Sequence, residues 1–195
     1  MSDRATTITK CRPILFSTPM VLKLLAGEKT QTRRIVKPQP TQEGATLWWK
    51  GLAYDLNKRP NWMEKRRCPY GLVGDRLWCR ETWRPALTED EHECYAYKAT
   101  LSYRCNKPMP EDFSQLTALN GGWKPSIHMP RKASRITLEI TGVKVERVED
   151  CSEEDAIAEG FSSKSEFLEY FYKLNPEAKN SWVWCIAFNR IDAID

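Results

Sequence analysis

Apolar positions along the chain follow the helical period in three segments and the strand period in most of the others. Residues 19–26 (PMVLKLLA) have helical spacing, and Gly27 is a natural stop. A second helix is expected between the cap residue Ser152 and Gly160, and a third over residues 165–173. Alternating or short apolar runs predict strands at residues 12–17, 30–36, 76–83, 95–99, 134–148 and 182–191.

The segment 134–148 carries the longest strand signal and contains a glycine near its centre. Ile136, Leu138 and Ile140 alternate before Gly142, and the alternation resumes through Val143. A glycine inside a strand is typical of a bulge or a bend. Many strands, few helices and no β-α-β alternation predict an α+β fold, and we expect a small mixed barrel instead of a doubly wound sheet.

Two long segments break this pattern. Residues 41–70 have no sustained period and are rich in Trp, Arg, Lys and Pro, so we expect an insertion with a small hairpin at about residues 47–54. Residues 100–131 are the second expected insertion: a polar, proline-punctuated loop at 101–122, followed by an extended stretch. Both are expected within a single domain that covers residues 1–195.

Charge is distributed unevenly along the chain. Residues 1–85 contain 17 Lys and Arg against 7 Asp and Glu, whereas residues 136–195 contain 6 against 13. A basic half with interleaved tryptophans suggests a polyanionic or nucleotide partner, because phosphates attract cations and bases stack on aromatic rings. The alternative, in which these charges solvate a surface and the tryptophans fill a core, fits the composition equally well.

The cysteine spacing and the hydropathy pattern indicate which cellular compartment and which cofactors to expect. Seven cysteines form no C-x-x-C pair, and only two histidines accompany them, so we expect reduced, mostly buried thiols and neither a metal nor another cofactor. No apolar run approaches the roughly 20 residues that span a bilayer. We therefore expect a cytoplasmic protein without a membrane partner.

The junction between the first helix and the following strand concentrates polar side chains. Lys29, Thr32, Arg33 and Arg34 lie within six residues. The phosphate-loop pattern is absent, as are the common hydrolase and dinucleotide motifs, so catalysis would rest on Lys, Thr, Glu, Asp, Arg or Cys. If burial lowers the pKa of Lys29, its neutral amine could take the proton of the Thr32 hydroxyl. The alternative is an ordinary solvated turn.

Further candidates lie outside this junction. Arg33, Arg34 and Arg80 could clamp a phosphate with forked donors, or could pair with the carboxylates of Asp75 and Glu81. The strand pattern predicts that Glu81 faces inward and therefore needs a partner. Glu159, at the end of an acidic helix, is the carboxylate of most interest. The rings of Trp78, Trp83 and Trp123 are candidates for stacking on a base.

The residues at the junction resemble a known family. Gly27-x-Lys29-x-x-x-x-Arg34 after a short helix, with Gly74-Asp75 opening a later strand, resembles the ASCH domain of the PUA-like superfamily. The runs RPILFSTPMVLKLLAGEKTQTRRIVKPQP, GDRLWCRETW and NSWVWCIAFNR resemble ASCH-containing proteins of phages and prophages. The resemblance implies a PUA-like β-barrel flanked by short helices, with a cleft suited to RNA, a nucleotide or a modified nucleoside.

This family includes small bacterial 4-acetylcytidine amidohydrolases, whose motif G-x-K-x-x-T-x-R matches Gly27, Lys29, Thr32 and Arg34. Their acidic-helix pattern [ST]-E-x-x-A-x-x-E matches residues 152–159 and ends on Glu159. The resemblance implies that Thr32 attacks the acyl carbon, Lys29 activates it, and Glu159 passes a proton to the leaving amine.

Two other functions remain open from the sequence. The first is a non-catalytic module that binds RNA, or DNA, or a modified base. The phosphate would be held by Lys29, Arg33, Arg34 and Arg80, and one of Trp78, Trp83 and Trp123 would stack on a base. The second is a phage protein that binds a host protein through the tryptophan-rich insertion.

Overall fold

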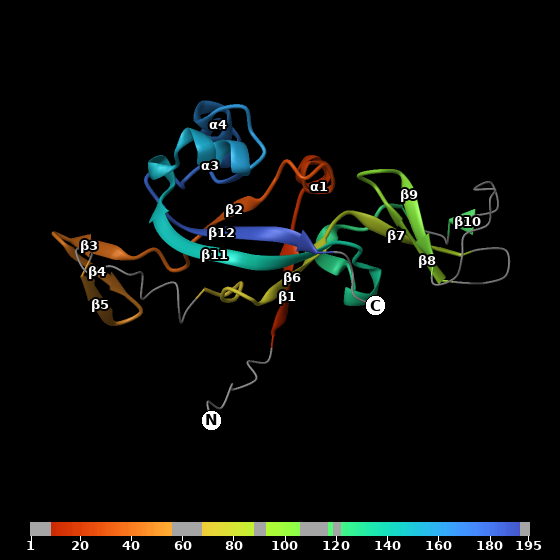
Figure 1. Ribbon diagram of the computed structural model, residues 1–195, viewed down its shortest axis with the longest axis horizontal. Coiled ribbons are helices and arrows are strands. Elements are labelled where there is room, and N and C mark those ends of the chain that lie inside the picture. The colour runs from red at the N-terminus through yellow and green to blue at the C-terminus, as the bar shows by residue number, and fades with distance from the viewer. Residues whose placement is uncertain (1–8, 56–67, 88–92, 106–116, 119–121, 192–195) are drawn as a thin grey trace, which may run out of the picture.

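The computed structural model describes residues 9–55, 68–87, 93–105, 117–118 and 122–191. It is an α+β fold with three sheets and short helices, which confirms the predicted class. A five-stranded sheet forms the centre, and a three-stranded and a four-stranded sheet lie at opposite ends of the molecule (Figure 1).

The central sheet has the order β1 (Cys11–Leu15), β6 (Arg76–Arg80), β11 (Thr137–Arg147), β12 (Trp182–Ile191), β2 (Gln31–Ile35). The β1–β6 pair is parallel and the other pairs are antiparallel. Among the described residues no ladder joins β2 to β1, so the expected closed barrel is not formed. At this gap the Arg34 side chain, not a backbone N–H, donates to the Leu15 carbonyl, at 2.8 Å.

The two longest strands, β11 and β12, form the spine of this sheet. Their register shifts between Ile140 and Gly142, which confirms the bend predicted at the glycine. The Gly142 position also faces the Ala187 side chain closely: a Cβ there would lie 3.4 Å from the Ala187 Cβ. The bend lets the carboxyl-terminal half of β11 curve toward the helices (Figure 1).

All three predicted helices are present. They are α1 (Thr18–Leu25), α3 (Glu153–Ala158) and α4 (Lys164–Leu174). The Ser152 and Ser163 side chains cap α3 and α4 by accepting hydrogen bonds from backbone N–H groups, as short polar residues at these positions do. The described residues also contain three 3-10 turns: η2 (Ser126–His128), η3 (Arg131–Ala133) and η4 (Val148–Asp150).

The first insertion forms a three-stranded meander, β3 (Thr41–Glu43), β4 (Thr46–Trp49) and β5 (Leu52–Asp55), which confirms the predicted hairpin. Leu47 and Trp49 are buried in the main core, where Trp49 meets Trp184 edge to face at 5.9 Å between ring centroids. Residues 56–67 of this insertion lie outside the described residues.

The predicted strand 76–83 is two strands, β6 and β7 (Trp83–Leu87), with a break at Glu81 and Thr82. At this break the buried Glu81 carboxylate accepts hydrogen bonds from the Arg135 guanidinium through both oxygens, at 2.8 and 2.9 Å. The strand expected at 95–99 is β8 (Glu93–Tyr97).

The second insertion contains strands where we expected a loop. Within the predicted loop 101–122, β9 (Ser102–Cys105) and β10 (Thr117–Ala118) join β7 and β8 in the order β10-β7-β8-β9. A separate small core supports this sheet; its members are Trp83, Tyr95, Tyr97, Met129 and Ala133. Residues 106–116 and 119–121 are outside the described residues, and the single-domain organisation stays a prediction.

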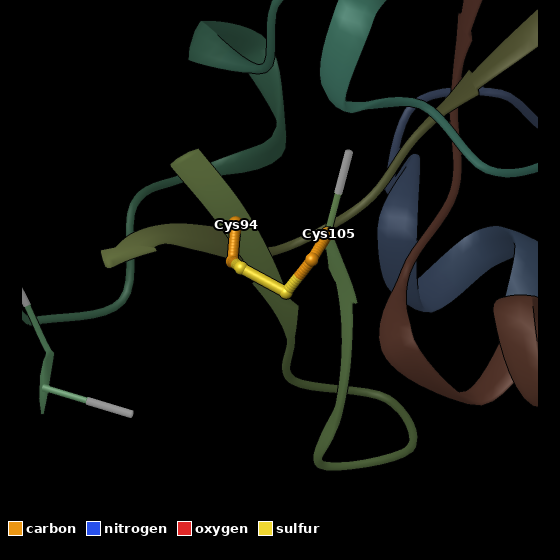
Figure 2. Close-up of a disulfide and its surroundings, with 2 residues drawn as sticks. All are labelled: Cys94 and Cys105. Carbon is orange, nitrogen blue, oxygen red and sulfur yellow. A yellow bond between two sulfur atoms is a disulfide. The ribbon is translucent and has the colours of Figure 1, made fainter. Parts of the chain in front are cut away.

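One cysteine pair corrects the expectation of reduced thiols. Cys94 and Cys105 form a disulfide (Figure 2). The β8–β9 register places the two residues directly opposite each other, with their Cα atoms 4.2 Å apart, which is why they can bond. The other five cysteines are free, and four of these are buried as expected.

Candidate functional site

A cavity of about 580 Å³ lies where β2, the end of α3, α4 and the first insertion meet. Lys29 precedes β2, Thr32 and Arg34 lie on β2, and Glu159 caps the carboxyl end of α3; all four line the cavity. Its wall is strongly aromatic, with Phe16, Trp49, Tyr70, Phe161, Phe167, Tyr170, Phe171 and Trp184.

The backbone brings Lys29 and Glu159 together from distant parts of the chain. Gly27 has φ +78°, a conformation that glycine adopts without strain, and it ends α1 and turns the chain toward β2. Next to Lys29, the Thr30 N–H donates to the Ala158 carbonyl at 2.8 Å. This bond fixes the start of β2 against the end of α3, beside Glu159; α3 and α4 lie together on this side of the sheet (Figure 1).

Lys29 and Glu159 form a buried ion pair. The Lys29 Nζ lies 2.5 Å from Glu159 Oε2 and also donates to the Glu159 carbonyl at 2.9 Å, and the two residues are only 4% and 3% exposed. Burial lowers the pKa of the Lys29 amine, the nearby charges of Arg34 and Arg33 lower it further, and Glu159 opposes the shift. The neutral form of the Lys29 amine is therefore more accessible than that of an exposed lysine.

Thr32 is buried at 1% exposure on β2. Its Oγ1 accepts a hydrogen bond from Arg34 Nη1 at 2.6 Å, which leaves the hydroxyl proton of Thr32 free to be donated. The Arg34 guanidinium is held in turn by the carbonyls of Arg33 and Leu15 and lies over the Phe16 ring, 5.1 Å from its centroid. Arg34 thus orients the hydroxyl at the cavity wall.

Arg33 also borders the cavity, but its guanidinium is bound by carboxylates of the protein. Its guanidinium donates to Glu146 Oε1 at 2.6 and 3.0 Å, to Asp155 Oδ2 at 2.7 Å, and lies 3.4 Å from Glu159 Oε1. The side chain is fully buried. Of the two roles predicted for Arg33, the structure therefore favours the structural one.

Glu146 and Asp155 complete this buried network behind the cavity. Lys144 Nζ bridges the two, at 3.0 Å from Glu146 and 2.9 Å from Asp155. Burial opposes ionisation of both carboxyl groups, but their hydrogen bonds and the positive charges of Lys144 and Arg33 prevail and lower both pKa values. The ionised carboxylates of Glu146 and Asp155 therefore hold the Arg33 guanidinium, which also contacts the Glu159 carboxylate.

The remaining sequence candidates lie away from the cavity. Arg80 stacks on the Trp78 ring at 4.7 Å, and Trp83 belongs to the small core of the four-stranded sheet. The Arg84 guanidinium lies over the Trp123 ring, 4.9 Å from its centroid, and Glu81 forms an ion pair with Arg135. The structure brings Lys29, Thr32, Arg33, Arg34 and Glu159 together, but not these five.

Several cavity residues were not among the sequence candidates. Trp49, Lys50, Pro69 and Tyr70 enter the wall from the first insertion, Lys37 follows β2, and Tyr170 comes from α4. The tryptophan-rich composition of the insertion was the available signal for Trp49. No periodicity or motif marked Lys37 or Tyr170.

The described residues contain no helix long and apolar enough to cross a membrane, and within them no group of three or more His, Cys, Asp and Glu residues is arranged to hold a metal ion.

No protein-family model and no curated protein matches the chain. Its fold is similar to the crystal structure of protein EF3133 from Enterococcus faecalis V583, described as family-model DUF984. The match covers 95% of this chain and 82% of that chain, with 11% sequence identity and a TM-score of 0.44. This is a coarse likeness of folds, and no function follows from it.

Proposed function

We propose that this protein is an ASCH-type member of the PUA-like superfamily whose cavity binds a cytidine-like nucleoside unit and hydrolyses an N-acyl group on its base. One observation carries the proposal: Lys29, Thr32 and Glu159, which the motif resemblance pairs with catalytic roles, line a single cavity. Its volume of about 580 Å³ and its aromatic wall suit a ligand with a flat ring.

The chemistry requires a base for the Thr32 hydroxyl. The Lys29 proton moves to Glu159, 2.5 Å away, and leaves a neutral amine beside a protonated carboxylic acid. The amine then takes the Thr32 proton as Oγ1 attacks the acyl carbon, and the base amine leaves with the proton of Glu159. The proton that Lys29 took then passes to Glu159, so the neutral amine can accept a proton from the water that attacks the acyl-threonine ester. Glu159 returns its proton to the departing Thr32 Oγ1, which regenerates the hydroxyl.

The direct test is turnover of 4-acetylcytidine, followed as loss of the acetyl group. Thr32→Ala and Lys29→Ala should each reduce kcat/KM by at least about 100-fold, because nucleophile and base act in the same step. Glu159→Gln preserves the shape but cannot exchange a proton, so it should also be slow. As a control, Ser17→Ala removes another hydroxyl that lines the cavity, from an exposed residue, and should retain most activity. No turnover by the wild-type protein would reject the hydrolase for this substrate.

The second candidate is a binding module without catalysis, which the combination of cations and aromatic rings around the cavity favours. It predicts binding of an RNA or nucleotide that weakens with salt and survives Thr32→Ala but not Arg34→Ala. Loss of binding together with loss of turnover in Thr32→Ala would favour the enzyme.

A further inference from the structure

Positive side chains outnumber negative ones around the cavity. Five cationic side chains line it, whereas Glu159 is the one carboxylate among the described lining residues. Lys29 forms an ion pair with Glu159, and Arg33 forms ion pairs with the Glu146 and Asp155 carboxylates behind the cavity. Arg34, Lys37 and Lys50 form no ion pair with any carboxylate in the described part of the chain.

These three cations, which we call the rim cations, are also more exposed than the reactive residues. Lys37 and Lys50 are exposed and Arg34 is half-buried, whereas Lys29 and Thr32 are buried. Lys50 lies over the Trp49 ring, 4.7 Å from its centroid, and so is held near the aromatic wall. The cavity therefore has a deep reactive end and a cationic outer end.

A nucleoside would leave the rim cations without a counter-charge, whereas a ligand with phosphate on its sugar would match them. A base that reaches Thr32 points its sugar away from the deep end, toward the rim cations. Lysine binds phosphate as a compact point charge, and arginine binds it through two parallel N–H donors of its guanidinium. We propose that the ligand of this cavity is phosphorylated, with its phosphate held by Arg34, Lys37 and Lys50.

This inference rests on the proposed function, because it takes the cavity as the substrate site. Such a phosphate occurs in a free nucleotide and in the backbone of RNA. The experiment therefore compares three probes by isothermal titration calorimetry: cytidine, cytidine 5′-monophosphate, and a trinucleotide RNA with a central cytidine.

The wild-type protein should bind cytidine 5′-monophosphate, or the trinucleotide, at least about tenfold more tightly than cytidine in 50 mM salt, and the advantage should shrink in 300 mM salt. A further gain for the trinucleotide over the monophosphate would identify RNA as the source, and equal or weaker binding would identify the free nucleotide. Equal affinity of all three probes, or binding of cytidine alone, would overturn the inference.

The double variant Lys37→Gln and Lys50→Gln should lose most of the preference for phosphate, with little change in cytidine affinity. The matched control is Lys98→Gln, at an exposed position at the end of β8 outside the cavity lining, which should keep the preference. If the double variant binds cytidine 5′-monophosphate as tightly as the wild type, the rim cations do not hold phosphate.

The two proposals fail separately. Turnover of 4-acetylcytidine without a phosphate preference would retain the hydrolase and reject the phosphorylated ligand. Phosphate-dependent binding without turnover would retain the phosphorylated ligand and favour the binding module.

Discussion

Arg33 is bound by carboxylates of the protein behind the cavity. All three nitrogens of its guanidinium donate to carboxylates, those of Glu146, Asp155 and Glu159, and its side chain is fully buried. A buried carboxylate without a partner is strongly unfavourable, so the arginine balances a cluster that could not otherwise fold in this form. The neighbouring Arg34, one residue along the strand, faces the cavity.

Replacing Arg33 with glutamine should therefore destabilise the fold by about 3–5 kcal/mol, because it leaves buried carboxylates uncompensated. The measurement is urea unfolding at neutral pH. Arg190→Gln is the matched control: Arg190 is exposed and, among the described residues, its side chain donates to the Leu25 carbonyl, so the loss should be about 1 kcal/mol or less. Similar stabilities for the two variants would contradict the structural role of Arg33.

The Lys29 amine should titrate below its ordinary pKa of 10.5, because burial disfavours its charged form. The measurement is a pH titration of the lysine side-chain NMR signals, with Lys29→Arg used to assign the resonance. Glu159 raises the pKa of Lys29 and Arg34 lowers it, so Glu159→Gln should shift the titration to lower pH and Arg34→Gln to higher pH. In the proposed mechanism the proton that Lys29 passes to Glu159 is the one that the leaving amine receives, so kcat/KM should fall on the alkaline side, with the same pKa, as Lys29 loses that proton.

A titration of Lys29 at or above 10.5, or shifts of the two variants in the reverse directions, would remove the physical basis for Lys29 as a base.

At the scale of elements, two of the candidate catalytic residues lie in the connections between helices and strands. Lys29 lies in the turn between α1 and β2, and Glu159 lies at the carboxyl cap of α3. Periodicity and capping residues predicted these elements well: α3 begins after Ser152, as expected from its hydroxyl and the acidic first turn. The polar loop predicted at 101–122 was wrong in part, because the four residues of β9 acquire strand structure by pairing with β8.

The β8–β9 hairpin also gives a direct test of the cysteine pairing. In the protein purified without reductant, alkylation after denaturation should modify five cysteines, and prior reduction should raise this to seven, as read by mass spectrometry. The double variant Cys94→Ser and Cys105→Ser should lose up to about 3 kcal/mol of stability, since the bond closes a chain segment of 11 residues. Cys11→Ser, at an exposed free cysteine, is the control and should change little.

Seven modified cysteines without reductant would mean that the hairpin holds two thiols and that the original expectation of reduced cysteines was correct.

At the scale of the whole molecule, cationic side chains from the basic first half of the sequence form ion pairs with carboxylates from its acidic last third. The basic first half supplies Lys29 and Arg33. The acidic last third supplies their partners, which are Glu146 on β11, Asp155 on α3 and Glu159 at the end of α3. Sequence motifs could identify the residues at each end of these pairs. They could not indicate that Arg33 faces inward and Arg34 outward, or that Trp49 would reach Trp184, because those facts depend on register and packing between distant segments.

The same pairing predicts how the whole fold responds to acid. Glu146 and Asp155 lie together in the network around Arg33, and Asp75 and Glu149 lie outside it. All four have lowered pKa values: burial opposes their ionisation, but hydrogen bonds and nearby cations outweigh it. Since the unfolded chain binds protons more readily at these groups, their contribution to stability is present above the ordinary values of 3.8 for Asp and 4.5 for Glu, and it is lost as the pH falls through the lowered values.

The free energy of unfolding should therefore be nearly constant from pH 7 to about pH 5 and should then decrease, by up to about 1.4 kcal/mol per pH unit for each proton taken up. Urea unfolding at pH 7, 5, 4 and 3 measures this. Asp75→Asn removes one such group, which accepts from the Lys10 and Leu72 N–H groups and from Arg12, so it should make the acid slope shallower. Glu169→Gln, at an exposed position on α4, makes the same change of charge and should leave the slope unchanged. Stability that rises on acidification would mean that the buried carboxylates repel one another more than their cationic partners hold them, and the network around Arg33 would then have to be rejected.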